Sequence, residues 1–317
     1  MTDILAQIPT LSLADQAHDP DGFAQAFGDS FRRFGFAIVA NHGIDAGLIE
    51  NAWALTRQFF DLPEAVKRHY YAADLAGQRG YTPFGTEIAK DAQHVDLKEF
   101  WHIGRDLPAG HRFRDHMPDN IWPAELPDFE PVFKAMYAAF DDAGNRLLAA
   151  IARYLGLAPN WFAPAVRDGN SVMRLLHYPP IPQDAPGIRA GAHGDINLIT
   201  LLLGAEEGGL QLLTRDGDWL SITPPEGAMV INVGDMLERL TNHYLPSTIH
   251  RVLNPPPERR HIPRYSMPFL LHLASDFMIE TLPGCITPDA PNRYPTPISA
   301  NDFLVERLIE IGLKKAG

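Results

Sequence analysis

The spacing of apolar residues predicts helices over much of the first half of the chain. Phenylalanines recur at helical intervals across residues 23–34, and a longer apolar face runs along residues 132–155. Asp45 is placed to begin a helix as its N-cap, and Pro63 suits the first turn of another. Residues 36–39 form a short apolar run typical of a buried strand. We therefore expect a first half that is mostly helical.

Short apolar runs separated by turn residues indicate a second half that is rich in strands. The strands are expected at residues 172–178, 196–203, 210–214, 219–222, 229–233, 251–253 and 265–273. Asp216-Gly217 suits a hairpin, and residues 301–313 predict a closing helix. Short strands at this spacing favour a sandwich or barrel, of which a jelly roll is one form. The expected fold class is α+β, with helices from both ends of the chain buttressing a β core.

Composition narrows the classes of partner. The 317 residues are enough for a large buried core, and the net charge of −12 argues against a nucleic-acid or anionic-membrane partner. The single cysteine, Cys285, cannot form an internal disulfide. No apolar run approaches the roughly 20 residues of a membrane span, and the first residues lack the pattern of a secretory peptide. We expect a cytoplasmic protein that acts on a small molecule, as a monomer or weak homo-oligomer.

The triplet His193-Gly194-Asp195 is the first candidate for metal chemistry. We expect it to begin a strand, so that both side chains point to the same face and bind one ion. The triplet alone is weak evidence, because His94-Val95-Asp96 has the same His-x-Asp spacing. No further histidine and basic strand follow His94 in the same way, and we interpret His94 as a surface or packing residue.

The third ligand is open on spacing alone and could be His243, His250, His261 or His272. His250 is favoured because it begins an apolar strand upstream of a basic one. Two imidazoles and a carboxylate leave one face of an Fe(II) ion open for reaction.

Arg264 and Ser266 are the candidates for binding an organic anion. They lie two residues apart on an expected strand and so project to the same side. A guanidinium fork beside a hydroxyl is a good receptor for a carboxylate in a dry barrel. A surface ion pair is the ordinary alternative for an isolated Arg-x-Ser. The apolar neighbours Met267 and Phe269 favour a buried arginine instead.

In this order along the chain, His193, Asp195, His250, Arg264 and Ser266 resemble the signature of the iron(II)/2-oxoglutarate dioxygenases, most closely the isopenicillin N synthase-like branch. Further landmarks of that family are matched at Ile8-Pro9, Gly35-Phe36, Asn41-His42-Gly43-Ile44, residues 174–180, Gly209-Leu210-Gln211, Asp216-Gly217, Trp219, Asn232-Val233-Gly234-Asp235 and Arg293-Tyr294-Pro295. The resemblance implies a double-stranded β-helix, the jelly roll of cupin-like proteins. It also implies one catalytic unit, 1–317, with three regions: a mainly helical N-terminal non-haem dioxygenase region (1–165), the jelly-roll core (170–275) and a C-terminal extension with a helix (276–317).

The resemblance assigns roles to individual residues. The implied catalytic metal ligands are His193, Asp195 and His250. The residues implied to bind 2-oxoglutarate are Arg264, Ser266 and Tyr178. Substrate contacts are expected, by analogy, at Tyr81, Phe84, Phe100 and Arg174. His42 and Asp235 fall in structural turns of the family and are not ligand candidates.

The chain departs from the family pattern at two places. Gly194 stands where the family often has threonine, a position that is not a ligand. Leu176 and His177 replace the asparagine and the first of two tyrosines found in plant members, so the residues around 2-oxoglutarate are expected to differ from those of the plant members. Arg174 alternates with Leu176 and Tyr178, so it either faces the pocket, where it favours an acidic substrate, or forms an ordinary salt bridge.

The expected activity is that of an iron(II)- and 2-oxoglutarate-dependent oxygenase. It uses O2 and couples decarboxylation of 2-oxoglutarate to succinate with hydroxylation, desaturation or ring closure of a small molecule. An iron oxidase of the same family that does not use 2-oxoglutarate, or an enzyme that forms ethylene and succinate, is the nearest alternative. A zinc hydrolase is less favoured because no glutamate general base accompanies His193. A non-catalytic β-helix binding protein is disfavoured by the intact ligand set.

Overall fold

Two facing β-sheets form the centre of the chain in the computed structural model, which describes residues 8–75, 77–87, 94–204 and 208–310. The larger sheet has eight strands, in the order β1 (Thr10–Ser12), β2 (Phe36–Ala40), β10 (Met229–Val233), β7 (Ile199–Leu203), β12 (Arg264–Leu271), β5 (Val172–Tyr178), β4 (Glu99–Gly104) and β3 (Gly80–Thr82). The smaller sheet has four, in the order β6 (Ala190–His193), β11 (His250–Val252), β8 (Leu210–Leu213) and β9 (Trp219–Ser221). A third, two-stranded sheet pairs β13 (Met278–Ile279) with β14 (Ile298–Ser299). This arrangement is the expected α+β fold with a jelly-roll core.

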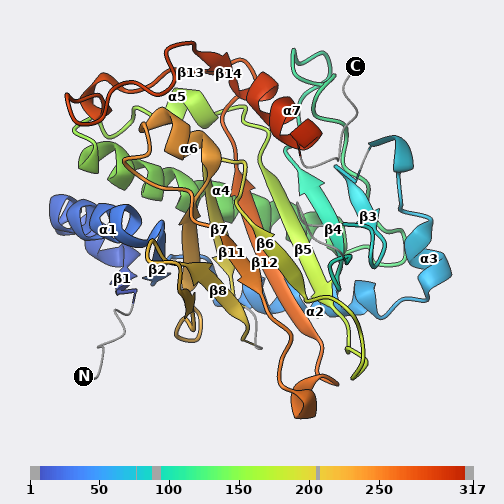
Figure 1. Ribbon diagram of the computed structural model, residues 1–317. Helices are drawn as coiled ribbons and strands as arrows, with labels where there is room; N and C mark the ends of the chain where they lie inside the picture. Colours follow the sequence, from blue (N-terminus) through green and yellow to red (C-terminus); the bar gives the residue numbers. More distant parts are fainter. Residues whose placement is uncertain (1–7, 76, 88–93, 205–207, 311–317) are drawn as a thin grey trace, which may run out of the picture.

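Helices surround this core (Figure 1). The α-helices are α1 (Pro20–Phe34), α2 (Ala46–Phe60), α3 (Glu64–Arg68), α4 (Phe129–Tyr154), α5 (Ala163–Val166), α6 (Asp235–Leu240) and α7 (Ala300–Glu310). Short 3-10 helices occur at η1 (Leu13–Ala17), η2 (Ala73–Leu75), η3 (Pro257–Arg259) and η4 (Pro283–Cys285). Among the described residues, none of the helices has the length and apolar character that crossing a membrane requires.

The long helix α4 packs against the outer face of the large sheet. Phe140 of α4 is fully buried and stacks on Phe269 of β12, with 5.4 Å between ring centroids. Because side chains alternate along a strand, Arg264 and Ser266 of the same strand point the other way, into the space between the two sheets. The apolar stripe of α4 thus fixes the strand that carries the expected anion-binding pair.

The strand predicted for residues 196–203 begins later than expected, which corrects the geometry proposed for the metal triplet. His193 is the last residue of β6, Asp195 lies in the connection to β7, and β7 starts at Ile199. The connection is held as a turn, because the backbone N–H of Asp235 donates to the carbonyl of Asp195 at 2.7 Å. The side-chain amide of Asn197 also donates to the carbonyl of Ile199 at 2.6 Å. His193 and Asp195 are therefore brought together by a turn, and not by alternation along one strand.

Other element ends also differ. Pro63 is the N-cap of α3 rather than a residue of its first turn, and α3 ends at Arg68. The closing helix is described as far as Glu310, so its expected last residues, 311–313, lie outside the described residues. The N-terminal region supplies β1 to β4 of the large sheet in addition to its helices. The boundaries proposed for the three regions of the chain stay a prediction.

Gly35→Ala is expected to lower the free energy of unfolding by about 2–4 kcal/mol, because it combines backbone strain with a steric clash. Gly35 ends α1 at φ 69°, and a Cβ atom there would lie 2.2 Å from Oγ1 of Thr248 and 2.6 Å from the carbonyl oxygen of Pro246. Gly110 provides a matched control, since it has φ 76° with no atom within 4 Å of its added Cβ. Denaturant unfolding of both variants measures the difference. Equal losses for the two would contradict the packing argument.

Candidate active site

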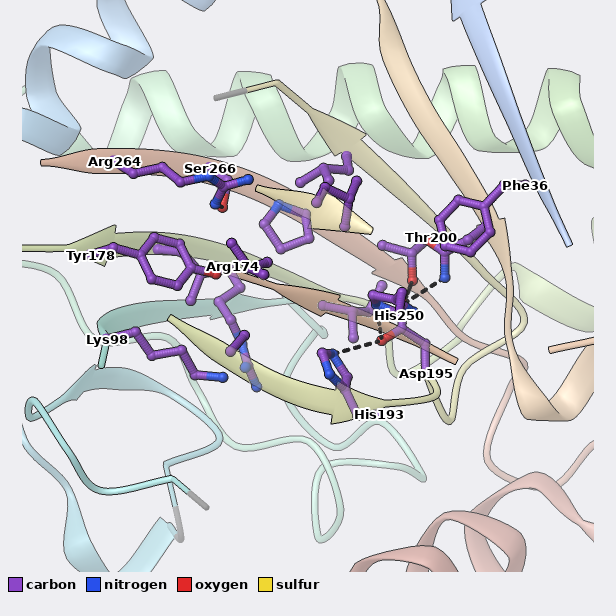
Figure 2. A pocket seen from close by; sticks show the side chains of 18 residues that line it. Phe36, Lys98, Arg174, Tyr178, His193, Asp195, Thr200, His250, Arg264 and Ser266 are labelled. Carbon is purple, nitrogen blue, oxygen red and sulfur yellow. Dashed lines mark hydrogen bonds and ion pairs between the residues drawn. The ribbon is translucent and has the colours of Figure 1, made fainter. Parts of the chain in front are cut away.

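The two sheets bring His193, Asp195 and His250 together. His193 ends β6 and His250 begins β11, and the two residues face each other across this antiparallel pair. Oδ1 of Asp195 lies 3.9 Å from Nε2 of His193 and 3.8 Å from Nε2 of His250. The potential ligand atoms of the three side chains all lie within 4.8 Å of one another, and no other such group occurs among the described residues (Figure 2).

Asp195 is held so that one carboxylate oxygen remains for an ion. Its Oδ2 accepts hydrogen bonds from Oγ1 of Thr200 at 2.6 Å and from Nδ2 of Asn232 at 2.8 Å. Oδ1 points toward the two histidines. Burial by itself would raise the pKa of Asp195, but His250, His193 and these hydrogen bonds lower it to about 2. The carboxylate is therefore ionised at neutral pH and oriented by its neighbours, as a metal ligand requires.

The two histidines are oriented by backbone carbonyls. Nδ1 of His193 lies 2.7 Å from the carbonyl oxygen of Gly191, and Nδ1 of His250 lies 3.2 Å from that of Thr248. A carbonyl only accepts, so these Nδ1 atoms carry the protons and each Nε2 keeps its lone pair toward Asp195. Burial and the neighbouring His250 lower the pKa of His193 to about 4, which keeps its ring neutral at pH 7. Two imidazoles and one carboxylate form a donor set that fits Fe(II).

The other candidate histidines are placed elsewhere or are engaged in the fold. His94 and His261 are exposed. His42 accepts from the backbone N–H of Ile44 at Nδ1, and its Nε2 lies 3.0 Å from the carbonyl oxygen of Gly227. His243 contacts the hydroxyl of Tyr294 at 2.6 Å. His272 is buried and lines a second cavity, with Nδ1 3.2 Å from the carbonyl oxygen of Leu270. His250 is thus the histidine that the fold brings to His193 and Asp195.

Arg264, Ser266 and Tyr178 lie in the same small cavity as the His-Asp-His group. This cavity has a volume of about 90 Å³, and its lining includes all six side chains. Arg264, Ser266 and Tyr178 are each no more than 4% exposed, which confirms the expectation of a buried arginine. Nη1 of Arg264 donates to Oγ of Ser266 at 3.2 Å, and its guanidinium lies 4.9 Å from the centre of the Tyr178 ring. A positive charge and two hydroxyls therefore face the metal-ligand group across one buried space.

The departures at Leu176 and His177 fall on opposite faces of β5. Leu176 lines the small cavity and makes its wall more apolar than an asparagine would. His177 points away from it, with Nδ1 2.7 Å from a carboxylate oxygen of Glu99 and its ring stacked on Tyr265 at 4.7 Å. The histidine therefore acts in the packing of β5 against β12, and does not contact the anion site.

The four residues expected near the substrate lie in different environments. Arg174 lines both the small cavity and a larger neighbouring cavity of about 640 Å³. Tyr81, Phe84 and Phe100 do not appear in the lining of either. Tyr81 is fully buried, and its hydroxyl donates to Glu99. Phe84 is 47% exposed. Phe100 packs against Arg174, with 4.2 Å between the guanidinium carbon and the centre of the ring. These three were expected by analogy, from an irregular and aromatic stretch of sequence, and such a stretch does not distinguish core from pocket.

Several lining residues were not among the predicted site residues. They are Arg79, Lys98, His102, Thr200 and Asn232. Thr200 and Asn232 lie on inward-facing positions of β7 and β10, which pair antiparallel and place the two residues opposite each other. Their role depends on that pairing, which strand periodicity does not predict.

Asn232→Ala is expected to weaken Fe(II) binding roughly 10- to 100-fold, the range typical for losing a residue that orients a metal ligand. The change removes one of the two donors to Oδ2 of Asp195. Anaerobic Fe(II) titration measures the effect. Asn145→Ala is the matched control, because Asn145 donates to the carbonyl of Asp141 on α4, away from the site. Unchanged Fe(II) affinity in the Asn232 variant would contradict the role given to this hydrogen bond.

Comparisons with known proteins agree with this geometry. Residues 8–125 match the family model described as non-haem dioxygenase in morphine synthesis N-terminal, and residues 169–273 match that of the 2OG-Fe(II) oxygenase superfamily. A 2-oxoglutarate-Fe(II) type oxidoreductase of Emericella nidulans is 33% identical over 283 residues, which cover 85% of this chain and 79% of the relative.

Solved structures extend the similarity to the whole fold. A Caulobacter crescentus protein assigned to the 2OG-Fe(II) oxygenase family is 58% identical, with a TM-score of 0.90 over 96% of this chain and 99% of that one. A Neurospora crassa protein, solved at full length in complex with alpha-KG, is 30% identical, with a TM-score of 0.86 over 97% of each chain. With these matches and the His-Asp-His group, the chain belongs to the 2OG-Fe(II) oxygenase superfamily, whose non-haem enzymes use Fe(II), 2-oxoglutarate and O2.

Proposed function

We propose that the small cavity is the reaction centre of this oxygenase and that the larger cavity holds the substrate. In this proposal His193, Asp195 and His250 hold Fe(II), and Arg264, with Ser266 and Tyr178, holds the far carboxylate of 2-oxoglutarate. The observation that carries the proposal is the shared lining of one cavity of about 90 Å³ by both groups. A dicarboxylate bound there spans from the arginine to the metal ligands.

Bound Fe(II) supplies the oxygen chemistry, in which 2-oxoglutarate is converted to succinate and carbon dioxide as the substrate is oxidised. The protein contributes binding and orientation. The guanidinium of Arg264 gives the far carboxylate a cationic partner that is held in place by Ser266. The rest of the cavity wall is largely apolar, including Phe36, Leu202 and Val252, which excludes water and strengthens the ionic contact.

The larger cavity supports a small organic substrate. Its volume of about 640 Å³ lies within the range usual for small-molecule sites, and it opens onto His193 and Asp195. Leu304 and Leu308 of α7 form part of its wall, so the closing helix belongs to the proposed substrate site. The Neurospora crassa protein has also been solved with alpha-KG and thymine, and thymine therefore belongs in any panel of trial substrates.

A comparison of two keto acids tests the proposed roles. 2-Oxobutyrate carries the same keto acid group as 2-oxoglutarate but has no far carboxylate. We expect both to bind the Fe(II)-loaded protein anaerobically, with 2-oxobutyrate at least roughly tenfold weaker, because it lacks the charge-assisted hydrogen bonds to Arg264. Calorimetric titration measures both affinities. Equal affinities, or equal binding of 2-oxoglutarate without metal, would contradict the arrangement.

We also propose a location, a class of partner and an oligomeric state. The protein is proposed to act in the cytoplasm on a small molecule, without a nucleic-acid or membrane partner. The acidic composition and the single cysteine of the chain support this. A monomer or weak homo-oligomer is the proposed state in solution. Light scattering at several concentrations of the Fe(II)-loaded protein tests it, and a stable higher oligomer at all concentrations would contradict it.

A further inference from the structure

Arg174 is fixed in place but keeps donor capacity for a ligand. Its Nε donates to Nε2 of His102, its Nη1 donates to Oε2 of Glu87 at 3.2 Å, and its guanidinium lies 4.2 Å from the centre of the Phe100 ring. Nδ1 of His102 lies 2.6 Å from the carbonyl oxygen of Gly77 and so carries the proton, which leaves Nε2 as the acceptor for Arg174. Among the described residues, Nη2 of Arg174 has no hydrogen-bond partner, and the side chain is 20% exposed.

The ion pairs around Arg174 are balanced without a ligand. Lys98 lies 2.8 Å from Asp96 and 2.9 Å from Glu87, and Glu87 also contacts Arg174. Two carboxylates and two cations therefore form a chain of ion pairs with no net charge in the lining of the larger cavity. Figure 2 shows Arg174 reaching from β5 toward the side where Lys98 and His193 lie.

Arg79 adds a positive charge that this chain of ion pairs does not balance. It lines the same cavity, is 1% exposed, and donates to the carbonyl oxygens of Pro118 at 3.1 Å and Gln78 at 2.7 Å. In the part of the chain that the structure describes, it has no carboxylate within ion-pair distance, and its Nη2 has no hydrogen-bond partner. Asp106 and Asp119 attract this charge from beyond ion-pair distance. A buried guanidinium without a direct counter-ion is costly, so this part of the lining favours an anion in the cavity.

Acidic side chains elsewhere in the lining limit how much negative charge a ligand can carry. Asp235, Glu238 and Glu310 also line the larger cavity, and Arg307 of the lining pairs with Glu310 at 3.0 Å. A second negative group near these carboxylates would meet like charges. The lining also includes apolar side chains, among them Val172, Ile196, Leu270, Leu304 and Leu308.

We propose that the substrate is a small organic monocarboxylate. Its carboxylate binds Arg174, near the positive charge of Arg79, and its apolar body packs against the apolar side chains of the larger cavity. Because Arg174 lines both cavities, a substrate anchored there has its body beside the metal ligands. This inference rests on the proposed function, since the larger cavity is a substrate site only if the neighbouring group holds iron.

Matched acids and amides test the inference with the protein loaded anaerobically with Fe(II) and saturated with 2-oxoglutarate. The probes are butyrate, benzoate and 3-phenylpropionate, each paired with its primary amide, with thymine as a neutral cyclic probe. Calorimetry and the change of the visible iron–2-oxoglutarate absorption measure binding. We expect at least one acid to bind at least roughly tenfold more tightly than its amide, the scale of a charge-assisted hydrogen bond.

Substitutions at Arg174 and Arg79, with one at Arg105 as a control, locate the contact. Arg174→Gln is expected to weaken the preferred acid by roughly 10- to 100-fold and its amide by less than about twofold. Arg105→Gln is the matched control, because Arg105 pairs with Asp141 at 2.8 Å and packs near Tyr137, and does not line the cavity. A further variant, Arg79→Gln, should weaken acids and not amides.

The outcomes separate the two proposals. Formation of the iron–2-oxoglutarate absorption would support the proposed function. With that absorption present, the monocarboxylate inference is wrong if amides or thymine bind as tightly as the acids, or if no acid binds. It is also wrong if Arg174→Gln leaves the affinity for the acid unchanged. If the absorption never forms with iron and 2-oxoglutarate present, the proposed function itself fails.

Discussion

His193→Ala is expected to abolish both stoichiometric Fe(II) binding and succinate formation. His193 supplies one of three ligand atoms, and its Nε2 lies 3.9 Å from Oδ1 of Asp195. Its loss leaves one histidine and one carboxylate, so the decrease should exceed the roughly 10- to 100-fold typical for a residue that only orients a ligand. Metal content after anaerobic gel filtration, with succinate assayed in parallel, measures the change.

The repeated triplet at His94 supplies the control for this experiment. His94 is exposed and lies outside the cavity linings, although it has the same His-x-Asp spacing as His193. His94→Ala should retain full metal content and turnover. Retention of both by the His193 variant would show that the iron is held elsewhere.

Arg264→Gln is expected to raise the dissociation constant of 2-oxoglutarate by roughly 100-fold or more while leaving Fe(II) affinity nearly unchanged. The side chain is 4% exposed, and its contact with a carboxylate would consist of charge-assisted hydrogen bonds in a dry cavity. Arg264→Lys keeps the charge but not the planar fork, and should recover only part of the affinity. Anaerobic calorimetry of the Fe(II)-loaded variants measures these constants.

A ligand without the far carboxylate provides the internal control. 2-Oxobutyrate cannot use Arg264, so its affinity should be nearly equal in the original protein and in Arg264→Gln. A similar loss for both ligands would mean that the variant disturbs the cavity as a whole, and the specific role of Arg264 would have to be given up.

Local sequence patterns predicted most elements because each has a local physical cause. Asp19 accepts from the backbone N–H of Gly22 at 2.9 Å and begins α1, and Gly35 ends it in the left-handed region. β5 spans 172–178, the predicted range. The resemblance of this order of residues to the iron(II)/2-oxoglutarate dioxygenases then predicted which residues would meet, and His193, Asp195 and His250 do meet.

Features that depend on long-range pairing could not be predicted in the same way. The turn that carries Asp195 is set by its bond to Asp235, forty residues later. The support of Asp195 by Asn232 depends on β10 lying beside β7. Arg79 lines the larger cavity, yet the prediction for this stretch fell on Tyr81, which does not line it. Tyr81 illustrates the converse, since an aromatic residue in an irregular stretch became part of the buried network around Glu99.

The most direct test of the account is the visible absorption of the protein after anaerobic addition of Fe(II) and then 2-oxoglutarate. If one cavity holds both, a weak charge-transfer band should develop and saturate at one equivalent of each per chain. The band should be absent from His193→Ala. Iron uptake without a band would mean that 2-oxoglutarate does not reach the metal, and no iron uptake at all would contradict the metal site.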